Sequence, residues 1–199
     1  MTAKIKLNSA SGGGSFSLQA PSSSSNNRVM TLPDTADGTV LTTTNPKAGN
    51  VIQVVSTTKT DTTSTSTSGS FTDISGMSVS ITPSSTSSKI LILISLGSIS
   101  SSVSGIAVGF KLLRDSTAVG NASSTSNRSG FTNIYTGGGT GDEYIISASH
   151  SFLDSPSSTS ALTYKIQWKN SSDTTYLNRY HGNNDNNGSS TITVMEVAA

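Results

Sequence analysis

The most informative feature of this chain is a dense apolar stretch inside a sequence dominated by serine and threonine. Residues 88–96 read Ser-Lys-Ile-Leu-Ile-Leu-Ile-Ser-Leu, and a second apolar run follows at residues 105–115 after a short Ser/Gly segment. A continuous branched-aliphatic run bounded by Ser, Gly and Pro is typical of a central strand buried on both faces. The two runs therefore predict a packed β core.

The composition predicts where that core lies. Ser and Thr make up about 35% of the 199 residues, and Leu, Ile, Val and Phe only about 21%. Disorder requires low hydrophobicity together with high net charge, and the formal charge here is only +1. Of the 42 Leu, Ile, Val and Phe residues, 8 lie in residues 1–50 and 34 in residues 51–199. This distribution predicts an N-terminal arm, residues 1–50, followed by one compact head domain, residues 51–199.

Charge and cysteine content exclude several classes of function. The 12 Lys and Arg are scattered and balanced by 11 Asp and Glu, whereas nucleic-acid binding needs clustered positive charge. With no cysteine, the chain can form neither disulfides nor thiolate metal sites. No segment resembles a membrane span or a signal peptide. We therefore expect synthesis in a cytoplasm without export by a signal peptide, no nucleic-acid partner, no membrane insertion, no metal and no cofactor.

Strand patterns recur at short intervals from residue 51 onward, and helical periodicity is almost absent. Eight or nine short strands separated by Ser, Gly and Asn turns predict an all-β fold. We expect an N-terminal β-arm followed by an antiparallel, jelly-roll-like β-sandwich. The expected strands of the head span residues 51–56, 71–83, 88–96, 105–115, 131–136, 143–152, 162–168, 174–178 and 190–197.

The arm has its own pattern of short, weakly amphipathic segments. Residues 15–21 alternate polar and apolar side chains, Gly12 to Gly14 form a flexible break, and residues 45–50 are expected to be a hinge. Short strands without a local hydrophobic partner are marginal alone, so the arm needs neighbouring copies or a docking surface to become ordered. The candidate assembly residues are its apolar side chains Phe16, Leu18, Val29 and Leu32.

Two series of motifs resemble a known family. In the arm they are Phe-Ser-Leu-Gln-Ala-Pro at residues 16–21, Arg-Val-Met-Thr-Leu-Pro-Asp at residues 28–34 and Asp-Gly-Thr-Val-Leu at residues 37–41. These are similar to the short β-arm of tail-fibre and virion-appendage proteins of tailed phages, especially phages of marine bacteria and cyanobacteria. A virion-protein domain that ends such fibres is similar to the head at residues 73–83, 88–92, 113–117, 153–156, 164–168 and 190–197.

The resemblance implies a virion structural protein that forms a homotrimer and contacts other virion proteins through its arm. The first hypothesis is a short tail fibre or receptor-binding appendage that attaches the particle to its host. The second is a capsid-surface decoration or fibre protein, since both locations need an anchoring arm. The third is a secreted carbohydrate-binding module, and the lack of a signal-peptide pattern counts against it.

Catalytic residues are not expected. The two histidines, His150 and His181, are far apart in sequence, and no Gly-x-Ser-x-Gly elbow accompanies either of them. Paired carboxylates would suit glycosidase chemistry, and Asp142 and Glu143 are adjacent. Both follow a glycine-rich segment, so a solvated strand entry is the favoured interpretation. The sequence thus predicts a non-enzymatic protein.

The best candidate for ligand binding is the segment before the last strand. Aromatic rings combined with amide and hydroxyl donors suit carbohydrate, so we expect host surface carbohydrate as the ligand. Asn and Asp also favour turns, and their oxygens can bind calcium, although the spacing of an EF-hand loop is missing. Trp168 is favoured as core over a role in binding. The candidate ligand-binding residues are Tyr176, Tyr180, His181, Asn183, Asn184 and Asp185.

Overall fold

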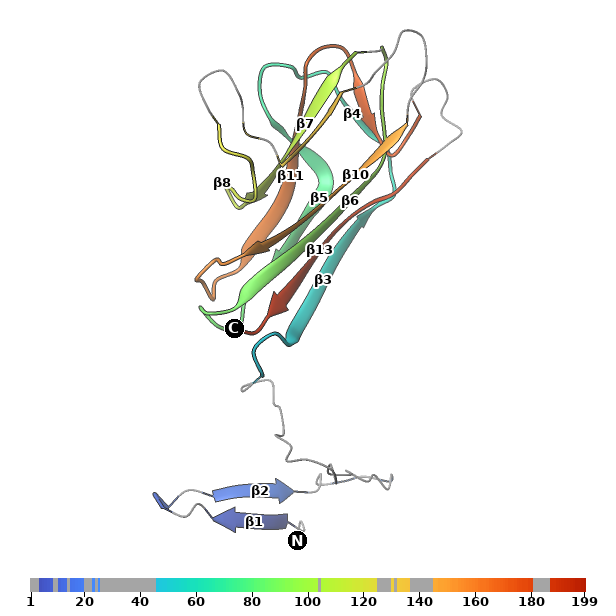
Figure 1. Cartoon of the computed structure of the whole chain (residues 1–199). Coiled ribbons are helices and arrows are strands. Elements are labelled where there is room, and N and C mark those ends of the chain that lie inside the picture. Colours follow the sequence, from blue (N-terminus) through green and yellow to red (C-terminus); the bar gives the residue numbers. More distant parts are fainter. Residues whose placement is uncertain are drawn as a thin grey trace, which may run out of the picture. The chain divides into compact units, whose positions relative to one another are not determined.

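A computed structural model describes residues 4–8, 11–13, 15–19, 23, 25, 46–103, 105–124, 130, 132–136, 145–180 and 187–199. Within these ranges every regular element is a strand and every strand pair is antiparallel, which confirms the all-β prediction (Figure 1). The strands are β1 (Lys4–Asn8), β2 (Ser15–Gln19), β3 (Val51–Lys59), β4 (Thr63–Thr65), β5 (Thr72–Ile81), β6 (Lys89–Ser101), β7 (Ala107–Arg114), β8 (Thr117–Ala118), β9 (Asn133–Thr136), β10 (Ile146–Asp154), β11 (Leu162–Asn170), β12 (Thr175–Leu177) and β13 (Ser190–Val197).

The chain divides into two compact units, Met1–Val40 and Leu41–Ala199. The first contains the hairpin of β1 and β2, and the second contains all other strands. The backbone N–H of Gly49 donates to the carbonyl of Ala198 at 2.8 Å, and the N–H of Ala198 donates to the carbonyl of Asn50 at 2.9 Å. Gly49 and Asn50, expected at the end of the arm, are therefore held by the head.

The head is a jelly roll, as its strand pairing demonstrates. The strand β3 pairs with β13, β5 with β11, β6 with β10, and β7 with β9. The first strand of the head thus pairs with the last. Each later pair joins strands that are closer together in the sequence than the pair before, which is the pattern of one long hairpin rolled into two sheets. We call β3-β13-β6-β10 the first sheet and β5-β11-β7-β9 the second sheet.

The central strand predicted from residues 88–96 is β6, which lies between β13 and β10. Its prediction as central is confirmed, but burial on both faces was wrong. Leu91 is half-buried and Leu93 is 38% exposed, because no described strand of the head packs on the outer face of the first sheet. An antiparallel sandwich needs only one buried face per sheet. The inward residues of β6 are Ile90, Ile92, Ile94 and Leu96.

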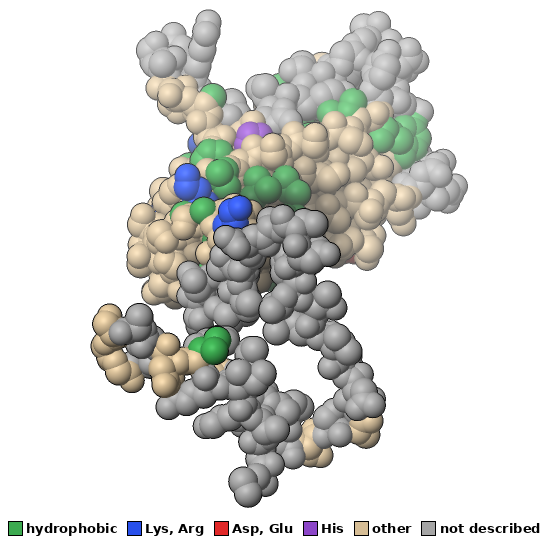
Figure 2. All heavy atoms as spheres, turned by 60° about the horizontal axis from the view of Figure 1, so that its bottom comes forward, with side chains coloured by type: hydrophobic (Ala, Val, Ile, Leu, Met, Phe, Trp, Pro, Cys, Tyr) green, Lys and Arg blue, Asp and Glu red, His purple; other side chains and the backbone are tan. Residues whose placement is uncertain are grey.

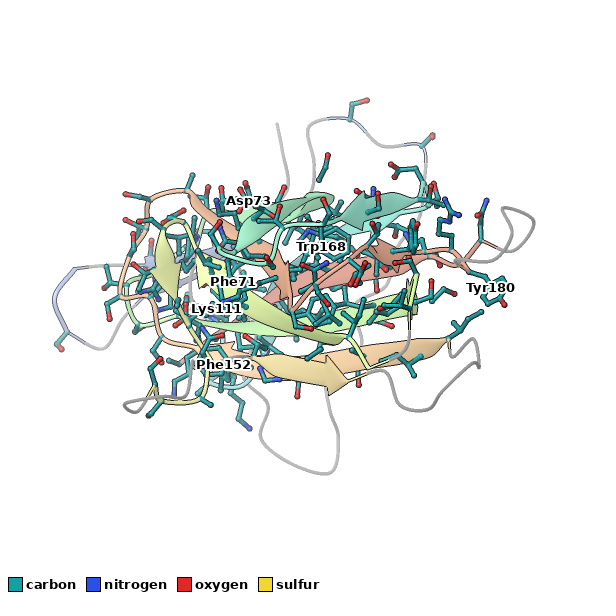
Figure 3. All side chains as sticks on the ribbon, turned by 90° about the horizontal axis from the view of Figure 1, so that it is seen from above. Phe71, Asp73, Lys111, Phe152, Trp168 and Tyr180 are labelled. Carbon is teal, nitrogen blue, oxygen red and sulfur yellow. The ribbon has the colours of Figure 1, made fainter. Side chains whose placement is uncertain are left out.

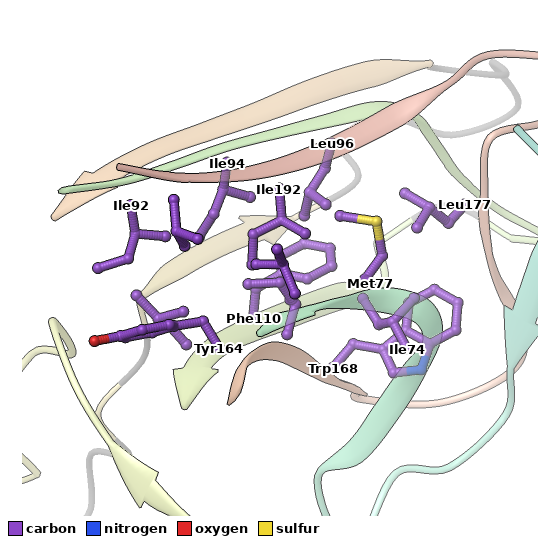
Figure 4. Close-up of a cluster of buried hydrophobic side chains, with 14 of the residues drawn as sticks. Ile74, Met77, Ile92, Ile94, Leu96, Phe110, Tyr164, Trp168, Leu177 and Ile192 are labelled. Atoms are coloured by element: carbon purple, nitrogen blue, oxygen red, sulfur yellow. The ribbon is translucent and has the colours of Figure 1, made fainter. Parts of the chain in front are cut away.

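The hydrophobic core fills the space between the two sheets (Figure 4). Trp168 is 2% exposed and Tyr164 is 0% exposed, which confirms the core interpretation of Trp168. Both belong to the inward set of β11, which alternates strictly with an outward, half-buried set. Members of the core from other strands include Ile74, Met77, Ile92, Phe110, Leu112, Leu177 and Ile192.

A buried carboxylate closes the core where the last strand meets the loop between β5 and β6. Glu196 is 0% exposed although it lies in the apolar strand β13. It accepts hydrogen bonds from Gln53 Nε2 at 2.6 Å, from the backbone N–H of Ser84 at 2.7 Å and from Ser84 Oγ at 2.6 Å. These donors satisfy a charge that would be costly to bury alone.

Candidate interaction surfaces

The predicted ligand-binding segment lies at one end of the head. Tyr176 is in β12, which pairs with β4 and with the last residues of β6, and Tyr180 follows shortly after (Figure 3). Both tyrosines are half-buried. The other four candidates, His181, Asn183, Asn184 and Asp185, lie outside the described residues. The ligand-binding role of this segment therefore stays a prediction.

Tyr176 is partly covered by its own neighbour. The guanidinium carbon of Arg179 lies 4.4 Å from the centroid of the Tyr176 ring, which is a cation–π contact. Arg179 Nε also donates a 3.1 Å hydrogen bond to the carbonyl of Tyr180. One face of the Tyr176 ring is therefore occupied, and a sugar could stack only on the other.

Sequence reasoning missed the residue that holds this segment in place. Asn178 is 0% exposed and has a positive φ of 63°. Its Nδ2 donates to the carbonyls of Lys59 at 2.9 Å and Asp61 at 3.1 Å, and Ser190 Oγ donates to its Oδ1 at 2.6 Å. Tolerance of left-handed geometry is a known property of Asn. Nothing in the sequence, however, pairs residue 178 with residue 59.

The assembly candidates Phe16 and Leu18 lie in the hairpin of the arm. The register sets Leu18 opposite Ile5 and Phe16 opposite Leu7. The register thus places these four apolar residues in two directly opposite cross-strand pairs. Leu7 is 58% exposed. Outside the described residues lie the two other assembly candidates, Val29 and Leu32.

The outer face of the first sheet carries a row of apolar side chains that crosses all four strands. The register aligns Val54 with Met195, Met195 with Leu91, and Leu91 with Leu153. Val54 is 55% exposed and Leu153 48%. In the space-filling view, hydrophobic side chains gather on one area of the head beside basic side chains, and a second group lies apart from it (Figure 2). We define the apolar face as Val51, Val54, Leu91, Leu93, Leu153, Met195 and Val197.

This apolar face is nearly free of charge. Lys89 is the one charged residue at the outward positions of the four described strands, and the outward residues that do not belong to the apolar face are otherwise Ser or Thr. Two of these hydroxyls, on Ser56 and Thr193, hydrogen-bond to each other at 2.8 Å. A shallow hollow of about 420 Å³ adjoins the face where β6 meets β10, lined by Leu93, Ile94, Ser149, His150 and Ser151.

The outer face of the second sheet differs in character. Asp73 accepts hydrogen bonds from Lys165 Nζ at 2.8 Å and from Gln167 Nε2 at 2.7 Å. Two further lysines, Lys111 and Lys169, lie at outward positions of the same sheet. The head therefore has one apolar, nearly neutral face and one polar, positively charged face.

The described part of the head contains little that could support catalysis. No group of three or more His, Asp or Glu among the described residues could hold a metal ion. His150 is half-buried at the edge strand β10, and its Nε2 makes no hydrogen bond there. Burial lowers its pKa, which favours the neutral imidazole. In the ranges that the structure describes, no helix could span a membrane.

Comparison with known proteins gives a fold-level likeness at most. No protein-family model matches the chain, and no curated protein matches it. Among solved structures, the VP2 subviral particle of infectious bursal disease virus is 14% identical, with a TM-score of 0.45 over 86% of this chain and 37% of that chain. The Gx strain of the same virus is 16% identical, with a TM-score of 0.40 over 97% of this chain and 46% of that chain.

The Gt strain is 14% identical, with a TM-score of 0.41 over 94% of this chain and 48% of that chain. The chain thus spans less than half the length of these viral proteins. At TM-scores below 0.5 these similarities carry no argument about function. The resemblance to phage appendage proteins rests on the sequence motifs and stays a prediction.

Proposed function

We propose that the chain is a non-enzymatic structural protein of a phage virion, which assembles through its arm and through the apolar face of its head. The observation that carries this proposal is the apolar row from Val54 to Leu153 on an otherwise hydroxyl-rich, nearly neutral sheet. Contiguous apolar patches on a soluble protein mark interaction sites. Such a patch fits an assembly protein better than it fits a freely diffusing enzyme.

The occupant that fits the apolar face best is a second copy of the same chain. Three copies can pack their apolar faces around a common three-fold axis without burying carboxylates, because the outward positions of the described strands of the first sheet contain none. Four strands about 4.8 Å apart and about eight residues long cover roughly 500 Å². A stable interface buries about 800 Å² per partner, so further contacts have to come from outside this sheet. The hairpin of the arm, with its two apolar cross-strand pairs, is a suitable source.

At finer detail the proposal is a homotrimeric short tail fibre or receptor-binding appendage, whose arm contacts other virion proteins and whose head faces the host. The arm motifs at residues 16–41 support this choice. The two-unit organisation, a hairpin followed by a separate head, is what an anchored appendage requires. A capsid-surface decoration protein would use the same two parts. The two alternatives therefore differ only in where the chain is located in the particle.

Analytical ultracentrifugation of the purified chain tests the assembly step. We expect a trimer at micromolar concentration, and we expect Val54→Ser combined with Leu153→Ser to weaken association at least tenfold. Val103→Ser is the matched control, because Val103 is 47% exposed in the connection between β6 and β7, away from the apolar face. A monomeric wild type, or an assembly unaffected by the double variant, would contradict the proposed role of this face.

Imaging of intact particles tests the location. Gold-labelled antibodies against the head should mark the tail of particles of the virus that encodes the chain. Labelling of the shell would support the capsid-decoration alternative. If purified particles contain none of the chain, the virion proposal is wrong and the carbohydrate-binding module becomes the better hypothesis.

A further inference from the structure

Two lysines converge on one aromatic ring at the outer face of the second sheet. Lys111 Nζ lies 4.2 Å from the centroid of the Phe71 ring (Figure 3). Lys169 Nζ lies 6.0 Å from the same centroid. The two ammonium nitrogens are therefore no further apart than the sum of these distances. We call Phe71, Lys111 and Lys169 the lysine–phenylalanine cluster.

The backbone brings the two lysines together. In the pairing of β11 with β7, Lys111 is opposite Gln167 and Lys169 is opposite Gly109. Lys111 and Lys169 are thus diagonal neighbours on one face, a spacing at which long side chains reach each other. Both are half-buried and belong to strands in the middle of the sheet, so their ammonium groups are held on a rigid support.

Among the described residues, no nearby carboxylate compensates the positive charge of the cluster. In the part of the chain that the structure describes, no carboxylate lies within 4.0 Å of Lys111 Nζ or Lys169 Nζ. The nearby carboxylate of Asp73 is engaged by Lys165 and Gln167, and the hydrogen bonds from these two side chains hold its pKa below the ordinary value. Asp73 therefore neutralises Lys165 and leaves Lys111 and Lys169 available to an external anion.

We propose that the lysine–phenylalanine cluster binds an acidic glycan, with one anionic group of the glycan bridging Lys111 and Lys169. An anion between two ammonium groups gains charge-assisted hydrogen bonds from both. The exposed hydroxyls of Ser78 and Ser80 lie on the same face and suit sugar hydroxyls. Two charges are too few for the phosphate backbone of a nucleic acid, whose affinity depends on many contacts.

This binding site is independent of the proposed assembly. The cluster lies on the outer face of the second sheet and the apolar face lies on the first, so the two surfaces point away from each other across the core. Glycan binding can therefore be present or absent whatever the oligomeric state. It also differs from the predicted site around Tyr176 and Tyr180, which is at the end of the head.

Calorimetric titration of the full chain with defined polymers tests the proposal. The probes are polygalacturonate for carboxylate groups, dextran sulfate for sulfate groups, and neutral dextran. We expect at least one acidic polymer to bind and neutral dextran not to bind. Lys111→Gln combined with Lys169→Gln should weaken binding at least tenfold, whereas the double Lys→Arg variant should retain it.

The matched control is Lys47→Gln combined with Lys89→Gln, which removes the same charge from exposed positions outside the cluster. We expect less than a twofold effect of this control. Phe71→Leu should weaken binding about threefold, because it removes the ring that holds the two lysines together. Three results would overturn the proposal. They are an equal loss of binding in the Lys111/Lys169 and Lys47/Lys89 glutamine variants, failure of both acidic polymers to bind, and equally tight binding of duplex DNA.

Discussion

The phenolic hydroxyl of Tyr164 on β11 donates a 2.7 Å hydrogen bond to Asp154 Oδ2 on β10, and so joins the second sheet to the first. Arg114 Nη1 on β7 donates to the same oxygen at 2.6 Å, and the backbone N–H of Ser155 donates to Asp154 Oδ1 at 2.9 Å. Burial, together with the adjacent carboxylate, raises the pKa of Tyr164 well above its ordinary value. The hydroxyl therefore stays a donor, and the two sheets are joined by directional bonds as well as by the core.

Removing that hydroxyl should loosen the sandwich. We expect Tyr164→Phe to lower the free energy of unfolding by about 1.5–3 kcal/mol, the range for a hydrogen bond to a charged group. Chemical denaturation measures this change. Tyr176→Phe is the control, since it keeps the ring under Arg179 and should leave stability unchanged. If the two variants lose stability equally, the Tyr164 hydroxyl does not connect the sheets.

Truncation of the core should unfold the head rather than alter its surface. Ile92 is 0% exposed and Phe110 is 2% exposed, so replacing either by Ala should lower the free energy of unfolding by about 2–5 kcal/mol. Val103→Ala, at an exposed position, should change it by less than about 0.5 kcal/mol. Thermal melts of the three variants provide the measurement. Unchanged melting of both core variants would show that these residues are not core.

Glu196 should make the head sensitive to acid. Burial raises the pKa of Glu196, but hydrogen bonds from Ser84, Gln53 and Ser88 outweigh that effect and leave the pKa below 4.5. Because the folded carboxyl binds its proton less tightly than the unfolded one, its contribution to stability is complete above the unfolded pKa. That contribution is lost as pH falls through the folded pKa.

The free energy of unfolding should therefore fall between about pH 5 and pH 3, and Glu196→Gln should flatten this part of the profile. Ser84→Ala should act in the same direction more weakly, because it removes one side-chain donor and leaves the backbone donor in place. Denaturation midpoints across this pH range provide the measurement. A Glu196→Gln profile parallel to the wild type would contradict the expectation.

His150 should make the stability of the head depend on pH in a range above that of Glu196. Burial lowers the pKa of His150 from 6.5, so its contribution to stability is complete above about pH 6.5 and is lost as pH falls through the folded pKa. We expect His150→Leu to reduce the difference between the melting temperatures at pH 7.5 and pH 5. The comparison is best made in a His181→Ala background, where His150 is the one histidine left. An unchanged difference would show that His150 does not titrate on unfolding.

The predicted ligand segment can be tested by adsorption. We expect Tyr180→Ala and His181→Ala to leave the melting temperature unchanged while reducing adsorption of particles to host cells several-fold, because each removes a ring that can stack on a sugar. Ser158→Ala, in the connection between β10 and β11, serves as the control. Normal adsorption of both loop variants would leave the segment as a simple turn and strengthen the capsid-decoration hypothesis.

The strands of the head could be predicted because their signals are local. Alternation and apolar runs at residues 51–56, 88–96, 162–168 and 190–197 correspond to β3, β6, β11 and β13. Strand periodicity depends only on neighbouring residues in the chain, so it survives in a sequence this rich in Ser and Thr. For the same reason the candidate site residues could be chosen by chemical type, but their surroundings could not be predicted.

By itself the sequence determined the all-β class, the apolar core segments and the concentration of core residues after residue 50. Tertiary structure alone decided that Arg179 covers one face of the Tyr176 ring, and that Lys111 and Lys169 share the Phe71 ring. It also decided that Leu91 and Leu93 face outward, which creates the apolar face. Each of these depends on which strands pair and in which register, because a shift of one residue moves every side chain of a strand to the opposite face.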